Sequence, residues 1–111
     1  MSILIIDDFQ EERDLLFTIL HSAGFGPLLP VGTAREGLQL LGVGKRGKQT
    51  SGIDLVLMDI EMPEIDGLEA CQRIRMEDQL QNLPIIVITA HTEAKDIQAA
   101  YTCGATDYIR K

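Results

Sequence analysis

The segment Pro-Ile-Ile-Val-Ile-Thr, residues 84–89, decides the fold class of this 111-residue chain. Its run of four β-branched apolar residues is typical of a strand that is buried on both faces of a parallel sheet. Two further apolar runs, residues 2–7 and 53–59, each end in aspartate. Three strands of this kind predict a central sheet that other elements cover on both sides.

Helical patterns separate these predicted strands. They occupy residues 9–23, 33–42, 66–78 and 93–102. Gly24 and Gly42 stand where the first two helices are expected to stop. Thr33 is a predicted N-cap, with Glu36 three residues later in capping-box position. Asp66 is interpreted as part of a turn and helix start rather than as a chemical group.

Two shorter strands complete the pattern. Residues 27–31 contain two prolines and predict an edge strand, because proline cannot donate a hydrogen bond to a central ladder. Residues 105–109 are expected to form a fifth strand. Strands that alternate with helices predict a doubly wound α/β fold, with a parallel sheet and right-handed crossovers. Residues 42–52 follow neither period and are expected to be a mobile surface loop.

Length and composition restrict the class of protein. A chain of 12.3 kDa with 45% hydrophobic and 24% charged residues is expected to form one globular domain. No apolar run reaches the ~18–20 residues that span a bilayer, and the start lacks a signal-peptide pattern, so we expect a cytoplasmic protein. The net charge of −7 argues against direct nucleic-acid binding and favours a cation ligand. Cys71 and Cys103 lack metal or redox spacing and are expected to be small apolar residues.

Charged residues elsewhere are interpreted structurally. Glu11, Glu12 and Asp14, in the first predicted helix, are expected to form a solvated face. The basic residues of the 42–52 loop lack the spacing of a phosphate-binding loop, so nucleotide binding is not expected there.

Polar residues follow the predicted strands at the edge where doubly wound sheets bind ligands. They are Asp7 and Asp8, Asp59, Thr89 and Lys111. Carboxylates that converge at one edge repel one another, and their burial is costly unless a cation compensates them. Hard oxygen ligands with open coordination positions favour Mg²⁺. The sequence therefore predicts a magnesium site.

Four blocks of sequence occur in an order that is typical of one protein family. They are Asp7-Asp8, Leu-Met-Asp-Ile-Glu-Met-Pro-Glu-Ile-Asp-Gly at residues 57–67, Thr89-Ala90, and Gly-Ala-Thr-Asp-Tyr-Ile-Arg-Lys at residues 104–111. Through these blocks the chain resembles the receiver domain of two-component response regulators over essentially its whole length. The resemblance implies a flavodoxin-like five-stranded sheet of order 2-1-3-4-5. It also implies a phosphoryl-accepting signalling switch that is not an enzyme, with at most slow self-dephosphorylation.

The resemblance assigns an acceptor and its metal ligands. Asp59 would accept a phosphoryl group from a histidine kinase or histidine phosphotransfer protein. Asp8 would bind Mg²⁺ directly, Asp7 through water, and Glu61 through its backbone carbonyl. An output domain or a second copy of the chain is a further expected partner, whereas nucleic acid and membrane are not.

Further residues would handle charge and signalling. Phosphoryl transfer depends mostly on positioning and charge neutralisation, and Lys111 is the ammonium that fits this need. Thr89 fits as a hydroxyl that donates to a phosphoryl oxygen. By resemblance, Thr89 and Tyr108 would form a switch that changes the surface of the fourth helix and fifth strand. Glu61 and His91 occupy positions at which family members influence the lifetime of the phosphate.

Two other functions are alternatives at this point. A magnesium-dependent aspartyl-phosphate hydrolase also uses a nucleophilic aspartate at a strand end. Such enzymes place a second acid as Asp-x-Asp, whereas this chain has Asp59-Ile60-Glu61. A phosphate-independent receiver-like interaction module would not need all the site residues named above.

The end of the sequence carries a structural expectation. Family members usually continue after this lysine with a fifth helix, so we expect the receiver domain of residues 1–111 to be truncated after its fifth strand. The loss of that helix would expose an apolar patch beside strands one and five, near the first helix. A chain with this patch is expected to be marginally stable, dimeric through the patch, or a piece of a longer protein.

Overall fold

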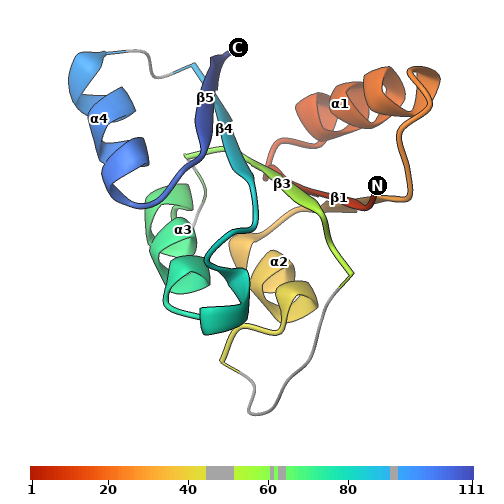
Figure 1. The fold of residues 1–111 in the computed structure, drawn as a ribbon. Coiled ribbons are helices and arrows are strands. Elements are labelled where there is room, and N and C mark those ends of the chain that lie inside the picture. Colours follow the sequence, from red (N-terminus) through yellow and green to blue (C-terminus); the bar gives the residue numbers. More distant parts are fainter. Residues whose placement is uncertain (45–51, 61, 63–64, 91–92) are drawn as a thin grey trace.

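The computed structural model describes residues 1–44, 52–60, 62, 65–90 and 93–111. Within this part of the chain, strands and helices alternate as predicted (Figure 1). The elements are β1 (Ile3–Ile6), α1 (Gln10–Ser22), β2 (Leu28–Val31), α2 (Ala34–Leu41), β3 (Leu55–Met58), α3 (Gly67–Arg75), the 3-10 helix η1 (Asp78–Leu80), β4 (Ile85–Thr89), α4 (Ala94–Thr102) and β5 (Asp107–Arg110). The sequence pattern does not predict η1. No helix in the described ranges has the length and apolar content needed to cross a membrane.

All five strands belong to one parallel sheet of order β2-β1-β3-β4-β5. This order confirms the predicted doubly wound, flavodoxin-like topology. β2, which contains Pro30, lies at an edge of the sheet, as its prolines predict. The strand order reverses at β1 and β3, where Ile6 pairs with Met58. The residues that follow this pair, Asp7 and Asp59, therefore leave the sheet at the same level.

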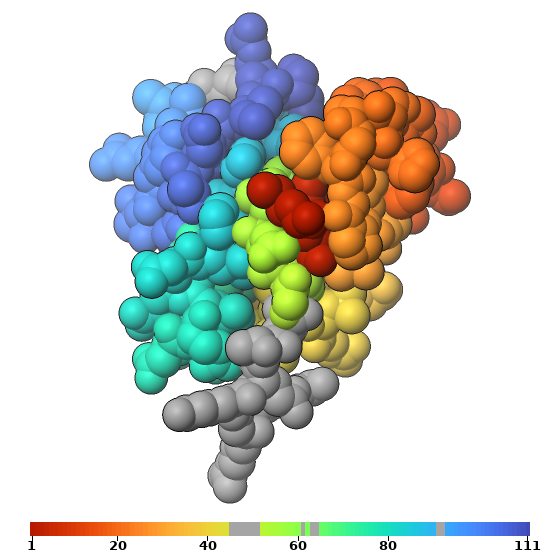
Figure 2. Space-filling model, turned by 45° about the vertical axis from the view of Figure 1, so that its right-hand side comes forward, coloured from red at the N-terminus to blue at the C-terminus, as the bar shows by residue number. Residues whose placement is uncertain are grey.

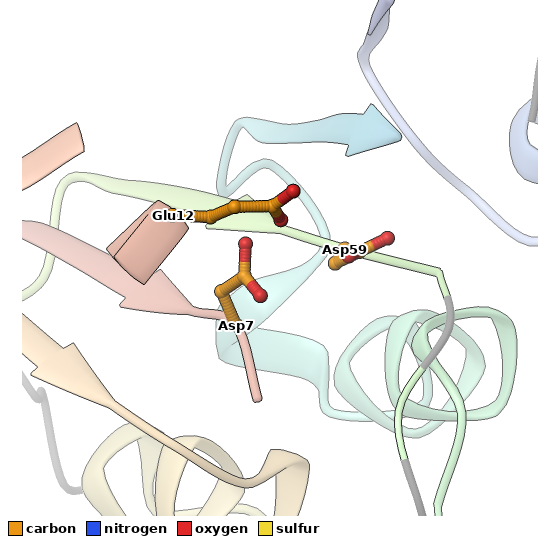
Figure 3. A group of neighbouring side chains, drawn as sticks. All are labelled: Asp7, Glu12 and Asp59. Carbon is orange, nitrogen blue, oxygen red and sulfur yellow. The ribbon is translucent and has the colours of Figure 1, made fainter. Parts of the chain in front are cut away.

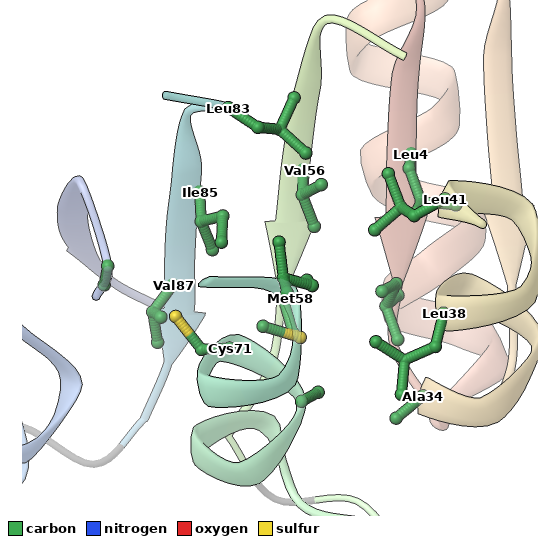
Figure 4. Close-up of a cluster of buried hydrophobic side chains, with 14 of the residues drawn as sticks. Leu4, Ala34, Leu38, Leu41, Val56, Met58, Cys71, Leu83, Ile85 and Val87 are labelled. Carbon is green, nitrogen blue, oxygen red and sulfur yellow. The ribbon is translucent and has the colours of Figure 1, made fainter. Parts of the chain in front are cut away.

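The larger part of the core lies on one face of the sheet, under α2, α3 and α4 (Figure 4). Because side chains alternate along a strand, every second residue of β1, β3 and β4 points to this face. Those residues are Leu4, Ile6, Val56, Met58, Ile85 and Val87. Cys71 of α3 is buried among them, and Cys103 is half-buried beside them. Both thiols are free, in agreement with their predicted role as small apolar residues.

α1 covers the opposite face, and it does so incompletely. Its Leu16 and Leu20 pack against the buried residues Ile3, Ile5 and Leu57. No residue of α1 is itself buried. The helix therefore lies on the sheet through a narrow contact, in contrast to the well-buried α2 and α3.

Several apolar side chains around this face are exposed. Leu15 and Ile19 of α1 are 60% and 53% exposed. Ile109 of β5 is 46% exposed, and it pairs with Ile88, whose side chain belongs to the α1 face. These exposures agree with the predicted apolar surface near α1 and β5.

The helix starts confirm the predicted caps. The Thr33 hydroxyl accepts a hydrogen bond from the Glu36 amide at 3.1 Å, and the Asp66 carboxylate accepts one from the Glu69 amide at 2.9 Å. Asp66 thus begins α3, as its interpretation as a helix start requires. Most of the predicted surface loop lies outside the described residues.

The amino ends of the strands are fixed by the start of the chain. The amide of Ser2 donates to the carboxylate of Asp54 at 2.8 Å, and the amide of Asp54 donates to the carbonyl of Ser2 at 2.8 Å. The terminal ammonium of Met1 donates to the carbonyl of Gly26 at 3.2 Å. Figure 2 shows the first residues, in red, between the orange segment that precedes β2 and the yellow-green segment that leads into β3. The opposite, carboxyl edge is the one that carries the charged residues.

Gly67 lets α3 approach the end of β3. Its amide donates to the carbonyl of Ile60 at 2.8 Å. A Cβ at this position would collide with the carbonyl oxygen of Asp59 and would lie 2.8 Å from the Cα of Ile60. Both obstacles are backbone atoms, so no side-chain rotation relieves the overlap. A glycine at the start of α3 is therefore needed to keep Asp59 in place.

The substitution Gly67→Ala is expected to destabilise the fold by about 1–3 kcal/mol, the usual cost of forcing an extra carbon into a packed site. Urea denaturation measures the loss. Gln72→Ala, an exposed change on the same helix, is the control and is expected to cost less than about 0.5 kcal/mol. Equal stability of the two variants would show that β3 and α3 separate without cost.

Candidate functional site

Two buried aspartates meet at the carboxyl ends of β1 and β3. Asp7 is 2% exposed and Asp59 is 9% exposed. The Asp59 amide donates to the carbonyl of Ile6 at 3.1 Å, which continues the β1–β3 ladder beyond the strands. The carboxylates of Asp7, Asp59 and Glu12 offer oxygens that all lie within 4.8 Å of one another (Figure 3). The predicted convergence of Asp7 and Asp59 at this edge is therefore present, whereas the third carboxylate of the close group is Glu12 and not Asp8.

The surroundings of Asp7 oppose its ionisation only in part. Burial raises the pKa of the Asp7 carboxyl above its ordinary value. The Phe9 amide, which donates to Asp7 Oδ1 at 3.0 Å, and the Lys111 ammonium both favour the charged form. The charges of Asp59 and Glu12 raise the pKa further. A site with this balance has a deficit of positive charge.

Lys111 supplies the cation on the protein side. Its Nζ lies 2.8 Å from Asp59 Oδ2 and 3.4 Å from Asp7 Oδ2, and it also contacts Glu12 Oε2. Its backbone amide donates to the carbonyl of Thr89 at 3.0 Å, which holds the residue at the end of β5. Burial lowers the pKa of Lys111, but the contacts with Asp59 and Glu12 outweigh it, so the net pKa is raised. The ammonium is therefore fully protonated at neutral pH.

The expected place of Glu12 on a solvated face is wrong. Its carboxylate reaches the site from the first turn of α1 and forms an ion pair with Lys111. A signal was available: a helix that follows an acid-terminated strand starts above the same sheet edge. The side-chain direction that selects Glu12 over Glu11 depends on how α1 is oriented, which the sequence pattern does not specify.

Thr89 and Tyr108 lie next to this group. Thr89 is 1% exposed at the end of β4 and also lines the pocket described below. Tyr108 pairs with Val87 in the β4–β5 ladder and packs against the larger core. Its hydroxyl is buried and has no hydrogen-bond partner among the described residues. Burial, and then the charges of Asp96 and Asp59, raise the pKa of the Tyr108 phenol.

A pocket of about 730 Å³ opens over the carboxyl edge of the sheet. Asp8, Asp59, Thr89 and Lys111 line it together, so four of the residues predicted for the site share one cavity. Asp8 is exposed and does not belong to the close group of Asp7, Glu12 and Asp59. The predictions for Glu61 and His91 fall on residues outside the described part of the chain.

The donor set fits a hard divalent cation. Three carboxylates within reach of one another offer only oxygen ligands, and one ammonium leaves their charge incompletely neutralised. The pocket leaves space for water and for an anionic group beside them. This arrangement suits the binding of a metal ion together with a phosphate-like ligand.

Comparison with known proteins assigns the family. The family model described as "Response regulator receiver domain" matches residues 3–111. The chemotaxis protein CheY-3 of Vibrio cholerae is 33% identical over 111 residues, which cover 100% of this chain and 80% of that protein. The CAI-1 autoinducer sensor kinase/phosphatase CqsS of the same species is 37% identical over 110 residues. The rice two-component response regulator ORR1 is 32% identical over 112 residues. The chain covers 98% of its own length in both of these matches, but only 15% of CqsS and 48% of ORR1.

Solved structures agree with this assignment. The signal receiver domain of a signal transduction histidine kinase from Syntrophus aciditrophicus superposes with a TM-score of 0.82 at 29% identity, over 99% of this chain and 77% of that one. The N-terminal domain of a response regulator receiver protein from Methanoculleus marisnigri gives 0.81 at 28% identity, over 99% and 83%. With its sheet order, its cluster of acids and these matches, the chain belongs to the receiver domain family of two-component response regulators.

Proposed function

We propose that Asp59 is the phosphoryl acceptor of this receiver domain. The observation that carries the proposal is the position of its carboxylate, which lies at the end of β3, lines the pocket and is 2.8 Å from the Lys111 ammonium. The acceptor oxygen is thus held beside a positive charge and open to an incoming donor. Asp7 lies close by without lining the pocket, so it is less accessible to a donor.

The phosphoryl transfer forms one bond and breaks one bond, and it needs little covalent chemistry from the protein. An Asp59 carboxylate oxygen forms a bond to phosphorus, and the bond from phosphorus to the leaving atom of the donor breaks. With acetyl phosphate the leaving group is acetate, which departs with the electron pair and needs no proton. With a phosphohistidine donor the ring nitrogen receives the electron pair and is protonated in the histidine kinase or phosphotransfer protein. Charge neutralisation and alignment are what the receiver domain contributes.

Magnesium is the proposed cofactor. Asp8 and Asp59 would ligate it by side chain, Asp7 through water and Glu61 through its backbone carbonyl. When bound, the cation neutralises charge on the phosphoryl oxygens. The closeness of the Asp7 and Asp59 oxygens, the place of Asp8 in the same pocket and the incomplete neutralisation by Lys111 support this cofactor.

The proposed switch consists of Thr89 and Tyr108. A phosphoryl group on Asp59 would accept a hydrogen bond from the Thr89 hydroxyl, and Tyr108 would move with it. The buried hydroxyl of Tyr108, which lacks a partner among the described residues, supports a side chain that gains from rearrangement. Such a movement would change the surface of α4 and β5 and so bias the choice of an output domain or second copy as partner.

The lifetime of the phosphoryl group and the nature of its donor complete the proposed function. Glu61 and His91 would modulate loss of the phosphoryl group, and the domain would act as a signalling module with at most slow self-dephosphorylation. Its donor would be a histidine kinase or phosphotransfer protein in the cytoplasm. The net charge of −7 gives no support to nucleic acid as a direct ligand.

Asp59→Asn is expected to abolish phosphorylation by acetyl phosphate with Mg²⁺, because the amide is not a nucleophile of comparable strength. Intact-mass spectrometry counts the phosphoryl groups, with one expected on the parent chain. Asp78→Asn, which changes an exposed residue of η1, is the matched control and should label as the parent does. Full labelling of the Asp59 variant would refute the acceptor assignment.

Asp8→Ala is expected to weaken Mg²⁺ binding far more than Glu61→Ala, because only the first change removes a proposed side-chain ligand. A calorimetric or fluorescence titration with MgCl₂ compares the dissociation constants. We expect a loss of about tenfold or more for Asp8→Ala and a small change for Glu61→Ala. Equal losses would mean that the proposed ligand set is wrong.

Lys111→Ala is expected to leave Mg²⁺ binding intact or to strengthen it, because the change removes a cation from a cluster of acids. It should impair phosphorylation and the response of the α4–β5 surface, since Lys111 is proposed to neutralise phosphoryl charge. Lys95→Ala, an exposed lysine on α4, is the control in the same titration. Loss of metal binding in the Lys111 variant alone would identify Lys111 as a structural residue instead.

A further inference from the structure

Each N–H donor of the Lys111 ammonium has a carboxylate partner in the structure. An ammonium has three N–H donors and no acceptor. Its three partners here are the carboxylates of Asp59, Asp7 and Glu12. A phosphoryl oxygen that is to be bound by Lys111 must therefore replace one of these partners.

Glu12 is the partner that is easiest to replace. Its side chain is 39% exposed, against 10% for Asp59 and 3% for Asp7. Asp59 must stay in place because it bears the new bond, and Asp7 is held by the Phe9 amide as well as by burial. When a phosphoryl oxygen displaces the Glu12 carboxylate from Lys111, water hydrates that carboxylate again. The free-energy cost of the displacement is therefore low.

The start of α1 is positioned so that Glu12 reaches the site. The guanidinium of Arg13 donates to the carbonyl of Asp7 at 2.7 Å, and the Arg13 amide donates to the carbonyl of Phe9 at 3.0 Å. The guanidinium contact joins the first turn of α1 to the residue that follows β1, and the amide bond is the first turn of the helix itself. No residue of α1 is buried, so this contact and the packing of Leu16 and Leu20 against the sheet hold the helix in place. Glu12 is therefore presented to Lys111 by a defined geometry.

We propose that Glu12 is a positioning residue that occupies Lys111 in the unphosphorylated protein and is displaced by the incoming phosphoryl group. The inference rests on the proposed function of Asp59. In their ionised forms, the three carboxylates and Lys111 leave two negative charges, and the carboxylate of Asp8 in the same pocket would add a third, so one Mg²⁺ would leave the site negative. The phosphoryl group then adds negative charge, and Glu12 opposes its arrival both by repulsion and by competition for Lys111. Glu12 therefore lowers the rate at which anionic donors phosphorylate Asp59.

The kinetic test is Glu12→Gln at saturating Mg²⁺ with acetyl phosphate as donor. The second-order rate constant of phosphorylation is expected to rise about two- to fivefold, as for the loss of one partly exposed ion pair that opposes the transition state. Glu11→Gln removes the same charge from the neighbouring residue, which is exposed and makes no ion pair with the described residues, and should change the rate less than twofold. An unchanged rate for Glu12→Gln would overturn the proposal.

A competing role for Glu12 gives the opposite sign. If Glu12 were a metal ligand, Glu12→Gln would weaken Mg²⁺ binding at least as much as Asp8→Ala and would slow phosphorylation. Either result overturns the proposal. Slower phosphorylation with unchanged labelling at Asp59 would leave the proposed function intact, whereas labelling of Asp59→Asn would remove that function itself. The two failures are therefore distinguishable.

The contact itself is tested without phosphorylation. Thermal melts in EDTA compare Glu12→Gln, Lys111→Ala and the double variant with the parent chain. If the ion pair exists in solution, the effects on Tm are non-additive by about 2–5 °C. Additive effects would contradict the occupancy of Lys111 by Glu12. The same cycle with Glu11→Gln in place of Glu12→Gln is the control, and its effects on Tm are expected to be additive.

Discussion

The repulsion between buried carboxylates at one sheet edge is the constraint on which the site depends. A parallel sheet with a reversal at β1 and β3 brings Asp7 and Asp59 to the same level, where Asp7 is buried and Asp59 is exposed only toward the pocket. Water therefore does little to reduce their mutual energy. Lys111 compensates them in part from β5, and the remaining charge makes the edge a receptor for a divalent cation.

The rest of the fold keeps that edge in position. The chain start fixes the opposite edge through the paired hydrogen bonds of Ser2 and Asp54, and Gly67 allows α3 to approach the end of β3. The two sheet faces differ in this respect. α2 and α3 are well buried, whereas α1 makes a narrow contact through Leu16 and Leu20, and its first turn is joined to the site by the hydrogen bond from Arg13 to Asp7. The position of α1 therefore affects the charge at the site, because its first turn carries Glu12 to Lys111. This is the structural basis of the proposed role of Glu12.

Much of the site was predictable because the residue types occur at strand ends. Asp7, Asp59, Thr89 and Lys111 each follow or end a predicted strand, and topology brings strand ends together. Asp8 also lines the pocket, in agreement with its expected place at this edge. Glu12 was not predictable in this way, because helical spacing places it on a face of α1 without specifying which side of that helix is turned to the sheet edge.

Local sequence patterns were sufficient to predict the α/β class, the order of the main elements, the caps at Thr33 and Asp66, and the edge position of the proline-containing β2. These features depend on local hydrophobic period, backbone restrictions and short-range hydrogen bonds, which are written in neighbouring residues. The identity of the three carboxylates around Lys111, and the extent to which α1 covers its face, follow from the folded arrangement alone. Those features depend on the distances between residues that are about a hundred positions apart, such as Glu12 and Lys111, and on the orientation of a helix that few buried contacts constrain.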